Sequence, residues 1–326
     1  MRLAVLGAGA WGSALATSFS GAHRVTLWAR RDAHRLAQAR ESPYLPGERF
    51  PDTLCVEGDL ATALRDADLV LVATATAGLR DTVRAVEDTR PGLPLLWACK
   101  GFETGTRRLP HEVVAEVRGA TSPCGALSGP SFALEVSRGQ PTAVVLASRD
   151  GAFAATTAAA LNGPRLRIYS SDDLVGVELG GAVKNVIAIA AGIADGLALG
   201  RNARAALVTR GLAEIVRLGV AMGGQPATFM GLAGLGDLVL TCTGELSRNR
   251  AVGLALAAGK TLEAALAELG HVSEGVASAL AVRDLARERG VDMPIAEAVC
   301  GILFGGLSPA AAVRELLARE PKAEGA

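Results

Sequence analysis

The chain contains few aromatic residues, few lysines and no net charge. Of its 326 residues, 4% are aromatic and four are lysine, so arginine supplies most of the positive charge. Acidic and basic residues balance, which gives a formal net charge of +0. A neutral chain has no basic field to attract nucleic acid or an anionic membrane, and no acidic tail is visible. We therefore expect neither nucleic acid nor membrane insertion among its interactions.

Cysteine is also scarce, with five residues scattered along the chain. An odd, dispersed set matches neither a disulfide framework nor the paired spacing of a metal site, so the sequence predicts no bound metal. Such thiols are typical of a reducing, cytoplasmic compartment. Half of the residues are apolar and we find no internal repeat or low-complexity linker, which predicts roughly two globular domains with a sizeable core.

Two apolar stretches resemble membrane signals. Residues 1–16 have the look of a short signal peptide, but Gly7, Gly9 and Gly12 would break its apolar helix. Residues 183–199 approach the length of a membrane span, yet they include Lys184, Asn185 and Asp195. We expect a strand, a turn and a helix in the first stretch and a buried helix in the second.

The first stretch carries a glycine-rich turn. Residues 3–6 predict a buried parallel strand, and Gly7-Ala8-Gly9-Ala10-Trp11-Gly12 follows, with a helix over 13–20 and a second strand over 25–28. This order predicts a dinucleotide-binding unit, in which Gly7, Gly9 and Gly12 allow a tight turn, close approach of the pyrophosphate and close packing of the helix. The alternative is a structural glycine turn in another α/β fold.

The end of the second strand bears on the choice of cofactor. An NAD-specific site has an acidic residue there, whereas this chain has Arg30 and Arg31 followed by Asp32. Arginine would pair with the 2′-phosphate of NADP, and Asp32 is expected to cap the next helix. The sequence therefore favours NADPH, or use of both NADP and NAD, over NAD alone. The alternative is that both arginines belong to a solvated turn.

Further glycine-bearing turns follow two later strands. A strand over 93–98 leads to Lys100 and Gly101, and a strand over 125–127 leads to Ser128-Gly129-Pro130-Ser131. The second turn predicts a helix initiated by Pro130 that offers backbone N–H groups to a ligand. Ligands of open α/β sheets bind at the carboxyl ends of the strands, so we expect Lys100, Gly129 and Ser131 to lie beside the first glycine turn.

Helical patterns alone continue from residue 174 onward, and we place the domains at 1–178 and 179–326. Lys184 opens the apolar stretch of the second domain. Burial lowers the pKa of a lysine, so Lys184 is a candidate proton donor and acceptor; the alternative is that its side chain reaches solvent at the helix start. Gly180 and Gly181 are expected to let cofactor and substrate approach this helix.

Two polar features follow in the helical half. Asp237 is a carboxylate in an apolar, glycine-rich run, so it needs a partner such as Lys184, unless it caps the following helix. Ser247, Arg248 and Asn249 open another helix, where an arginine suits a phosphate, although a surface turn is the alternative. Asn202 is expected to cap a helix over 203–222.

Taken together, these motifs resemble the bacterial NAD(P)-dependent glycerol-3-phosphate dehydrogenase family. They occur in family order from residue 3 to about 300. The motifs are 7–12, 97–101, 128–133, 179–188, 200–204, 234–238, 247–249 and 274–275. The resemblance implies an α/β Rossmann-type N-terminal domain and an all-α C-terminal domain like that of 6-phosphogluconate dehydrogenase. It also implies a cytoplasmic homodimer that reversibly converts dihydroxyacetone phosphate to sn-glycerol 3-phosphate for phospholipid biosynthesis.

The resemblance also assigns roles to residues. Lys184 would be the proton donor and acceptor, with Lys100 and Asp237 beside it. The substrate would be bound by Lys100, Gly129, Ser131, Lys184, Asn185, Asp237, Thr241, Ser247, Arg248 and Asn249. The cofactor would be bound by Gly7, Gly9, Ala10, Trp11, Gly12, Arg30, Arg31, Lys100, Ala133, Arg248, Val272 and Glu274.

The sequence departs from the family at Ala10, where many relatives have serine. That removes one side-chain contact to the phosphates and leaves the backbone contacts in place. Two alternative functions stay open at this stage: another two-domain reductase of hydroxyacids or keto acids, and a nucleotide sensor without catalysis.

Overall fold

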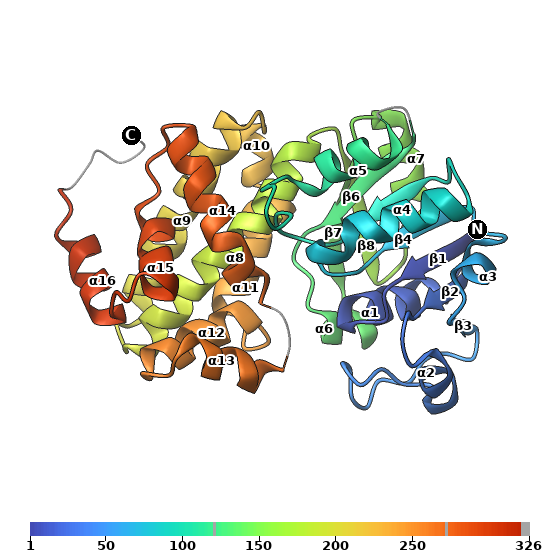
Figure 1. Cartoon of the computed structure of the whole chain (residues 1–326), viewed down its shortest axis with the longest axis horizontal. Helices are drawn as coiled ribbons and strands as arrows, with labels where there is room; N and C mark the ends of the chain where they lie inside the picture. The colour runs from blue at the N-terminus through green and yellow to red at the C-terminus, as the bar shows by residue number, and fades with distance from the viewer. Residues whose placement is uncertain (120–121, 271–272, 321–326) are drawn as a thin grey trace.

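The computed structural model describes residues 1–119, 122–270 and 273–320. Figure 1 shows that the chain forms two halves side by side, a sheet-based half that contains the N-terminus and a helical half that contains the C-terminal helices. The predicted boundary at residues 178 and 179 lies inside one long helix, α8 (Leu174–Gly196). Val177 packs in a core of the sheet half and Leu179 packs in the core of the helical half. We propose to retain the boundary there.

The first half is built on a sheet of eight strands in the order β3-β2-β1-β4-β5-β6-β7-β8. Within the described residues, neighbouring strands are parallel except β6 and β7, which are antiparallel. The strand order reverses between β1 and β4, which is where open α/β sheets bind ligands. The strands are β1 (Arg2–Leu6), β2 (Arg24–Trp28), β3 (Leu54–Glu57), β4 (Leu69–Val72), β5 (Leu95–Trp97), β6 (Cys124–Ser128), β7 (Thr142–Ala147) and β8 (Leu166–Ser171).

Helices cover both faces of this sheet. Alternate residues of a strand point to opposite faces, and in β1 Leu3 and Val5 pack in one core cluster while Ala4 and Leu6 pack in another. Burial on both faces explains the continuous apolar runs of the strands. The helices of this half are α1 (Ala10–Phe19), α2 (Ala33–Ala39), α3 (Leu60–Leu64), η1 (Thr76–Gly78), α4 (Leu79–Thr89), α5 (Pro110–Arg118), α6 (Ala133–Ser137) and α7 (Gly151–Leu161).

The long helix α8 runs through the centre of the helical half, with the other helices around it (Figure 1). The expectation that strands end before residue 174 is confirmed within the described residues. The surrounding elements are α9 (Arg201–Ala221), α10 (Pro226–Phe229), the π-helical turn η2 (Leu232–Gly236), α11 (Asp237–Thr243), α12 (Arg248–Ala257), α13 (Leu262–Leu269), α14 (Glu274–Glu288), α15 (Pro294–Phe304) and α16 (Pro309–Leu317).

Two glycines allow α8 and α12 to pack closely. A Cβ atom on Gly192 would lie 2.0 Å from the Arg250 carbonyl oxygen, and one on Gly253 would lie 2.1 Å from the Ile189 carbonyl oxygen. Neither backbone oxygen can move without moving its helix, so only glycine fits at these two positions. This contact holds the start of α12, which carries Arg248, against the core helix.

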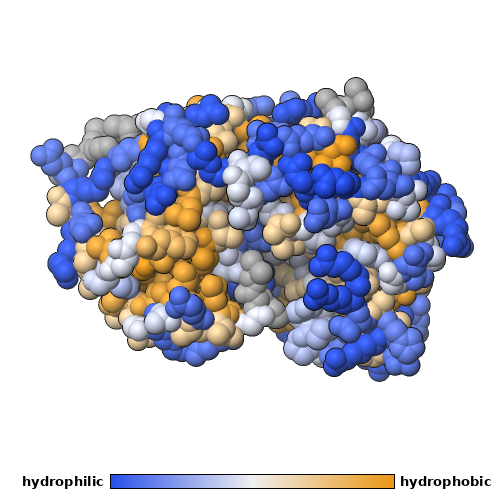
Figure 2. Space-filling view, viewed as in Figure 1, coloured by the Kyte–Doolittle hydropathy of each residue, from blue (hydrophilic) through white to orange (hydrophobic). Residues whose placement is uncertain are grey.

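Two stretches, Leu174–Gly196 and Pro226–Thr243, are long and apolar enough to span a membrane by composition. In the first, 94% of the apolar window is buried inside the fold, as expected for a core helix. The second is divided into α10, η2 and α11 and is 39% buried. Figure 2 shows that apolar residues also gather on the surface of the helical half, around α15.

Two local predictions were wrong. Asn202 does not cap α9, because the helix begins at Arg201 and Gly200 occupies the capping position. Pro130 does not initiate a helix either, since α6 begins at Ala133 after Phe132 and is 5 residues long. In both places a glycine with positive φ, Gly200 or Gly129, precedes the helix.

Candidate active site

The glycine-bearing turns meet at one edge of the sheet, as expected. Strands β1, β4, β5 and β6 are parallel, so their carboxyl ends lie side by side. Lys100 follows β5 and Gly129 follows β6. The helix α8 reaches the same edge, because a Cβ atom on Gly181 would lie 2.8 Å from the Ser128 Oγ and 3.4 Å from the Lys100 Cδ.

At this edge one carboxylate binds two lysines. The Lys184 Nζ donates to Asp237 Oδ1 and, at 2.8 Å, to Thr241 Oγ1. The Lys100 Nζ donates to Asp237 Oδ2 at 2.8 Å and to the Gly129 carbonyl oxygen at 3.0 Å. Lys184 is 6% exposed and Asp237 is 1% exposed, so the alternative of a lysine reaching solvent is excluded. Lysines from both halves therefore share one buried counter-charge.

This environment changes the acidity of Lys184. Its pKa is lowered from 10.5 to about 8, because burial and the positive charge of Lys100 together outweigh the Asp237 carboxylate, which raises it. A lysine with a pKa near neutrality can exchange a proton with a ligand at physiological pH. The arrangement thus makes Lys184 an acid and a base within one buried site.

The direction of Asp237 depends on the turn before it. Asp237 is the first residue of α11 and follows the π-helical turn η2 directly. A Cβ atom on Gly180 would lie 2.4 Å from the carbonyl oxygen of Ala233 in this turn. Gly180 and Gly181 therefore allow contacts of α8 with η2 and with Ser128. Our expectation that these two glycines make room for cofactor and substrate was wrong, because protein atoms already fill that space.

A second polar cluster includes Asn185, the residue that follows Lys184 on α8. The Asn249 Nδ2 donates to Asn185 Oδ1 at 2.9 Å, and the Asn249 Oδ1 accepts from Ser273 Oγ at 2.6 Å and from the Gly275 N–H at 3.0 Å. These bonds join the start of α12 and the start of α14 to α8.

Arg248 and Ser247 stand at the start of α12 beside this cluster. Ser247 caps the helix by accepting from the Arg250 N–H, and Arg248 is the exposed first residue. The helix N-terminus and the guanidinium together present positive charge to the site.

The charge of Arg248 also acts on Glu274, at the start of α14. Burial raises the pKa of Glu274, and Arg248 opposes the rise. A Cβ atom on Gly101 would lie 3.1 Å from the Glu274 Oε2, so this carboxyl lies beside the turn after β5. Val272, another predicted cofactor residue, lies outside the described residues.

The first glycine turn borders a cavity of about 840 Å³. Gly7 has a φ of +116°, and a Cβ atom on Gly12 would lie 1.9 Å from the Gly7 carbonyl oxygen, so both positions require glycine. Gly9 has open space where its side chain would be, next to the N-terminus of α1. This backbone leaves room for a pyrophosphate at a helix N-terminus, which fits a dinucleotide.

Two of the remaining predicted cofactor residues line this cavity, and three others do not. Arg30 and Arg31 line it after β2, and both are exposed. Asp32 follows at the capping position of α2, but its side chain makes no cap bond. Ala10 and Trp11 at the start of α1 and Ala133 at the start of α6 pack against one buried cluster of Ala14, Leu45 and Val136. The sequence reasoning missed Thr74, which lines the cavity after β4; its place at the end of a strand beside β1 could have identified it.

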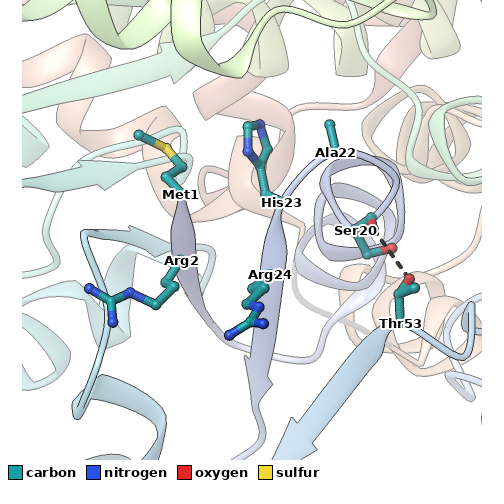
Figure 3. A pocket seen from close by; sticks show the side chains of 7 residues that line it. All are labelled: Met1, Arg2, Ser20, Ala22, His23, Arg24 and Thr53. Carbon is teal, nitrogen blue, oxygen red and sulfur yellow. Dashed lines mark hydrogen bonds between the residues drawn. The ribbon is translucent and has the colours of Figure 1, made fainter.

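A second cavity of about 580 Å³ lies at the opposite edge of the sheet (Figure 3). Met1 and Arg2 at the start of β1 lie beside His23 and Arg24 at the start of β2, and Thr53 Oγ1 donates to the Ser20 carbonyl oxygen at 3.2 Å. Since this cavity borders the amino ends of the strands, it is separate from the lysine site.

Two family models match the chain. One is described as the N-terminus of NAD-dependent glycerol-3-phosphate dehydrogenase and matches residues 2–154. The other is described as the C-terminus of the same enzyme and matches residues 173–314.

Individual relatives agree with these matches. Proteins named glycerol-3-phosphate dehydrogenase [NAD(P)+] from Aromatoleum aromaticum and Dechloromonas aromatica are each 58% identical and cover 99% of this chain, over 100% and 99% of their own lengths. A crystal structure of glycerol-3-phosphate dehydrogenase from Coxiella burnetii superposes with a TM-score of 0.93 at 42% identity, covering 98% of this chain and 99% of that one.

Proposed function

Because this chain belongs to the NAD-dependent glycerol-3-phosphate dehydrogenase family, we propose that its lysine site interconverts dihydroxyacetone phosphate and sn-glycerol 3-phosphate with NAD(P)(H). The observation that carries this function is the buried group of Lys184, Asp237 and Lys100 at the carboxyl edge of the sheet. The family models and the full-length relatives favour this function over the two alternatives considered from the sequence, another hydroxyacid or keto-acid reductase and a nucleotide sensor without catalysis.

Lys184 is the proton donor in the direction of ketone reduction. An ammonium has three donors, and among the described residues two of those of Lys184 go to Asp237 and Thr241. The third is available to the substrate oxygen on which negative charge develops. General acid catalysis of this kind contributes about 10²–10⁴ in rate. In the reverse direction the neutral amine accepts the proton, and a pKa of about 8 allows both forms near neutral pH.

Lys100, Asp237 and Thr241 set the pKa and the orientation of Lys184. The positive charge of Lys100 stabilises charge on the substrate oxygen and lowers the pKa of Lys184. The Asp237 carboxylate raises the pKa of Lys184 and lies between the two lysine side chains. Thr241 accepts from Lys184 and donates to the Asp237 carbonyl oxygen at 2.6 Å, so it restricts the ammonium to one direction.

The phosphate of the substrate is assigned to the start of α12. Arg248 supplies a charged guanidinium there, and Ser247, Asn249 and Asn185 supply polar groups beside it. Gly129 and Ser131 border the site from the end of β6. Binding the phosphate away from the reacting carbon uses remote binding energy to align that carbon.

NAD(P)H, when bound, supplies the hydride. The glycine turn of residues 7–12 would hold the pyrophosphate, with Ala10, Trp11 and Ala133 beside it. We assign Glu274, which lies beside the turn after β5, to the nicotinamide side of the cofactor, and we assign Val272 to the cofactor as well. Arg30 and Arg31 suit a 2′-phosphate, which supports a preference for NADPH over NADH. The kcat/KM values measured with both cofactors test this preference, and equal values would contradict it.

We also propose an oligomeric state and a cellular location for this protein. Nine of the twelve large apolar side chains that are exposed among the described residues belong to residues 199–317, in the helical half. Such exposure supports a homodimer formed through that half. Sedimentation equilibrium of the pure protein would test the dimer. We further propose a cytoplasmic enzyme that is not inserted in a membrane and supplies sn-glycerol 3-phosphate for phospholipid biosynthesis.

One experiment tests the catalytic assignment. We expect purified protein to oxidise NADPH when dihydroxyacetone phosphate is added. Lys184→Ala should retain NADPH binding and lose about 10²-fold or more of turnover, because the proton donor is gone. The control is NADPH binding measured by fluorescence in both proteins. Wild-type turnover in the variant would exclude Lys184 as the proton donor.

A further inference from the structure

A buried carboxylate outside the reacting groups joins three elements of the fold. The Glu178 Oε1 accepts from the Trp97 Nε1 at 2.7 Å and from the His111 backbone N–H at 3.0 Å. The Glu178 Oε2 lies 2.5 Å from the His111 Nδ1. Glu178 is 5% exposed and Trp97 is 0% exposed, so these bonds are shielded from water. The carboxylate therefore holds together the end of β5, the start of α5 and the first half of α8.

Two of these elements position the two lysines of the site, since Lys184 lies on α8 and Lys100 lies in the turn after β5. Trp97 ends β5, and Lys100 follows it by three residues. Glu178 precedes Lys184 by six residues on α8, a rise of about 9 Å along the helix. The bond between Trp97 and Glu178 thus joins the two segments that bring Lys100 and Lys184 to Asp237.

The chemistry of the cluster favours a positioning role over simple packing. A buried carboxylate is costly unless donors satisfy it, and well-packed apolar residues often stabilise a core equally well. Hydrogen bonds, unlike apolar contacts, fix a direction and a register. A cluster that binds a strand end and a helix by directed bonds restricts how far one can slide along the other.

We propose that Glu178 is a positioning residue for the reaction, which holds α8 against β5 so that Lys184 and Lys100 stay on opposite oxygens of Asp237. The inference rests on the proposed function of the two lysines. Glu178 touches neither lysine, and it acts through Trp97 and through its own helix.

The test compares Glu178→Ala with Glu178→Gln. The alanine variant should lose about tenfold to a hundredfold in kcat, since small misplacements of reacting groups cost up to about 10² in rate. Its KM for NADPH should stay within about twofold, because the glycine turn is not affected. The glutamine variant keeps an acceptor for Trp97 and should stay within about threefold of the wild-type kcat.

The pKa of Lys184 gives a readout that does not depend on turnover. The chain has four lysines, so a spectrum of ¹³C-labelled lysine side chains is simple to assign. In Glu178→Ala the loosened site admits water, which reduces the cost of burying the ammonium and raises the pKa of Lys184 by about one unit. A role in packing alone would lower thermal stability without this shift.

The matched control is Glu214→Ala. Glu214 is 1% exposed and accepts from the Ile295 N–H at 2.7 Å and the Ala296 N–H at 3.2 Å, away from both lysines. Its loss should lower thermal stability and leave both kcat and the pKa of Lys184 unchanged. Trp97→Phe, which removes the indole donor together with part of the buried ring, replaces Glu178→Ala if that variant does not fold.

The kcat values and the pKa of Lys184 together distinguish a positioning role of Glu178 from a role in packing. A fall in kcat together with a raised pKa of Lys184, in Glu178→Ala or Trp97→Phe and not in Glu214→Ala, supports the inference. Wild-type kcat and an unshifted Lys184 overturn it. If the wild-type protein fails to reduce dihydroxyacetone phosphate, the proposed function falls, and the lysine spectra still decide whether Glu178 positions the site.

Discussion

Replacing Asp237 with asparagine should shift the pH range in which the enzyme reduces its substrate. The variant keeps the size and shape of the side chain and removes the negative charge that both lysines share. Burial and the charge of Lys100 lower the pKa of Lys184, whereas Asp237 raises it. Without Asp237 the largest effect that raises this pKa is removed, so the pKa of Lys184 should fall below its present value of about 8.

The size of the shift follows from the contact between the charges. Two unit charges about 4 Å apart interact with about 4 kcal/mol in surroundings of intermediate dielectric constant, which corresponds to about two to three pKa units. That would lower the pKa of Lys184 to about 5 to 6, within the range known for buried lysines. At pH 7 the ammonium fraction would drop from about nine-tenths to about three per cent, a loss of about thirtyfold.

The assay is the rate of dihydroxyacetone phosphate reduction from pH 5 to pH 9, with saturating substrate and NADPH. We expect the variant to have low activity at neutral pH and to recover much of its activity toward pH 5, since protonation of Lys184 is restored there. Lysine ¹³C spectra of the free enzyme supply the pKa independently. An activity loss that is equal at every pH, with Lys184 titrating as in the wild type, would refute the charge coupling.

Three further changes have definite expected outcomes. Arg248→Ala should raise the KM for dihydroxyacetone phosphate by about tenfold to a hundredfold, the value of a charge-assisted contact, and an unchanged KM in initial-rate kinetics would rule out the phosphate role. Gly253→Ala should lower the free energy of unfolding by about 1–3 kcal/mol, because its Cβ would lie 2.1 Å from the Ile189 carbonyl oxygen; an unchanged melting temperature would contradict the close contact of α8 and α12. Burial raises the pKa of Glu214 to about 7 from 4.5, so its contribution to stability is complete below about pH 4.5 and is lost as the pH rises through 7. Denaturant titrations at about pH 5 and about pH 8 should show that the free energy of unfolding falls by up to about 3 kcal/mol because of this group, and that this fall is absent in Glu214→Gln. An equal change of the free energy of unfolding between the two pH values in both proteins would disprove it.

Much of the fold could be predicted because the relevant signals are local. The apolar runs of the strands, the glycine turn at residues 7–12 and the loss of strand patterns after residue 174 each depend on a few neighbouring residues. The parallel sheet then brings strand ends together, so Lys100 and Gly129 could be placed near the first turn before any coordinates were known.

Other features depend on contacts that sequence spacing does not contain. Lys184 and Asp237 lie 53 positions apart, and their ion pair was suggested only by the cost of burying each charge. The roles of Gly180 and Gly181 were misjudged, since the carbonyl oxygen of Ala233 and the hydroxyl of Ser128 come from distant segments. The cluster of Glu178, Trp97 and His111 was missed entirely, because a lone glutamate at a helix start carries no local sign of burial.

The π-helical turn η2 makes the direction of Asp237 depend on how the backbone before it is wound. A π-turn contains one residue more than an α-turn, and α11 begins immediately after it with Asp237. If residues 232–236 were wound as a regular α-helix without any change in length, Asp237 would be rotated by about 100° around the axis. The carboxylate would then face away from both lysines, although every side chain proposed for catalysis would still be present. One surplus residue in the backbone thus sets the direction of the charge on which the two lysines depend.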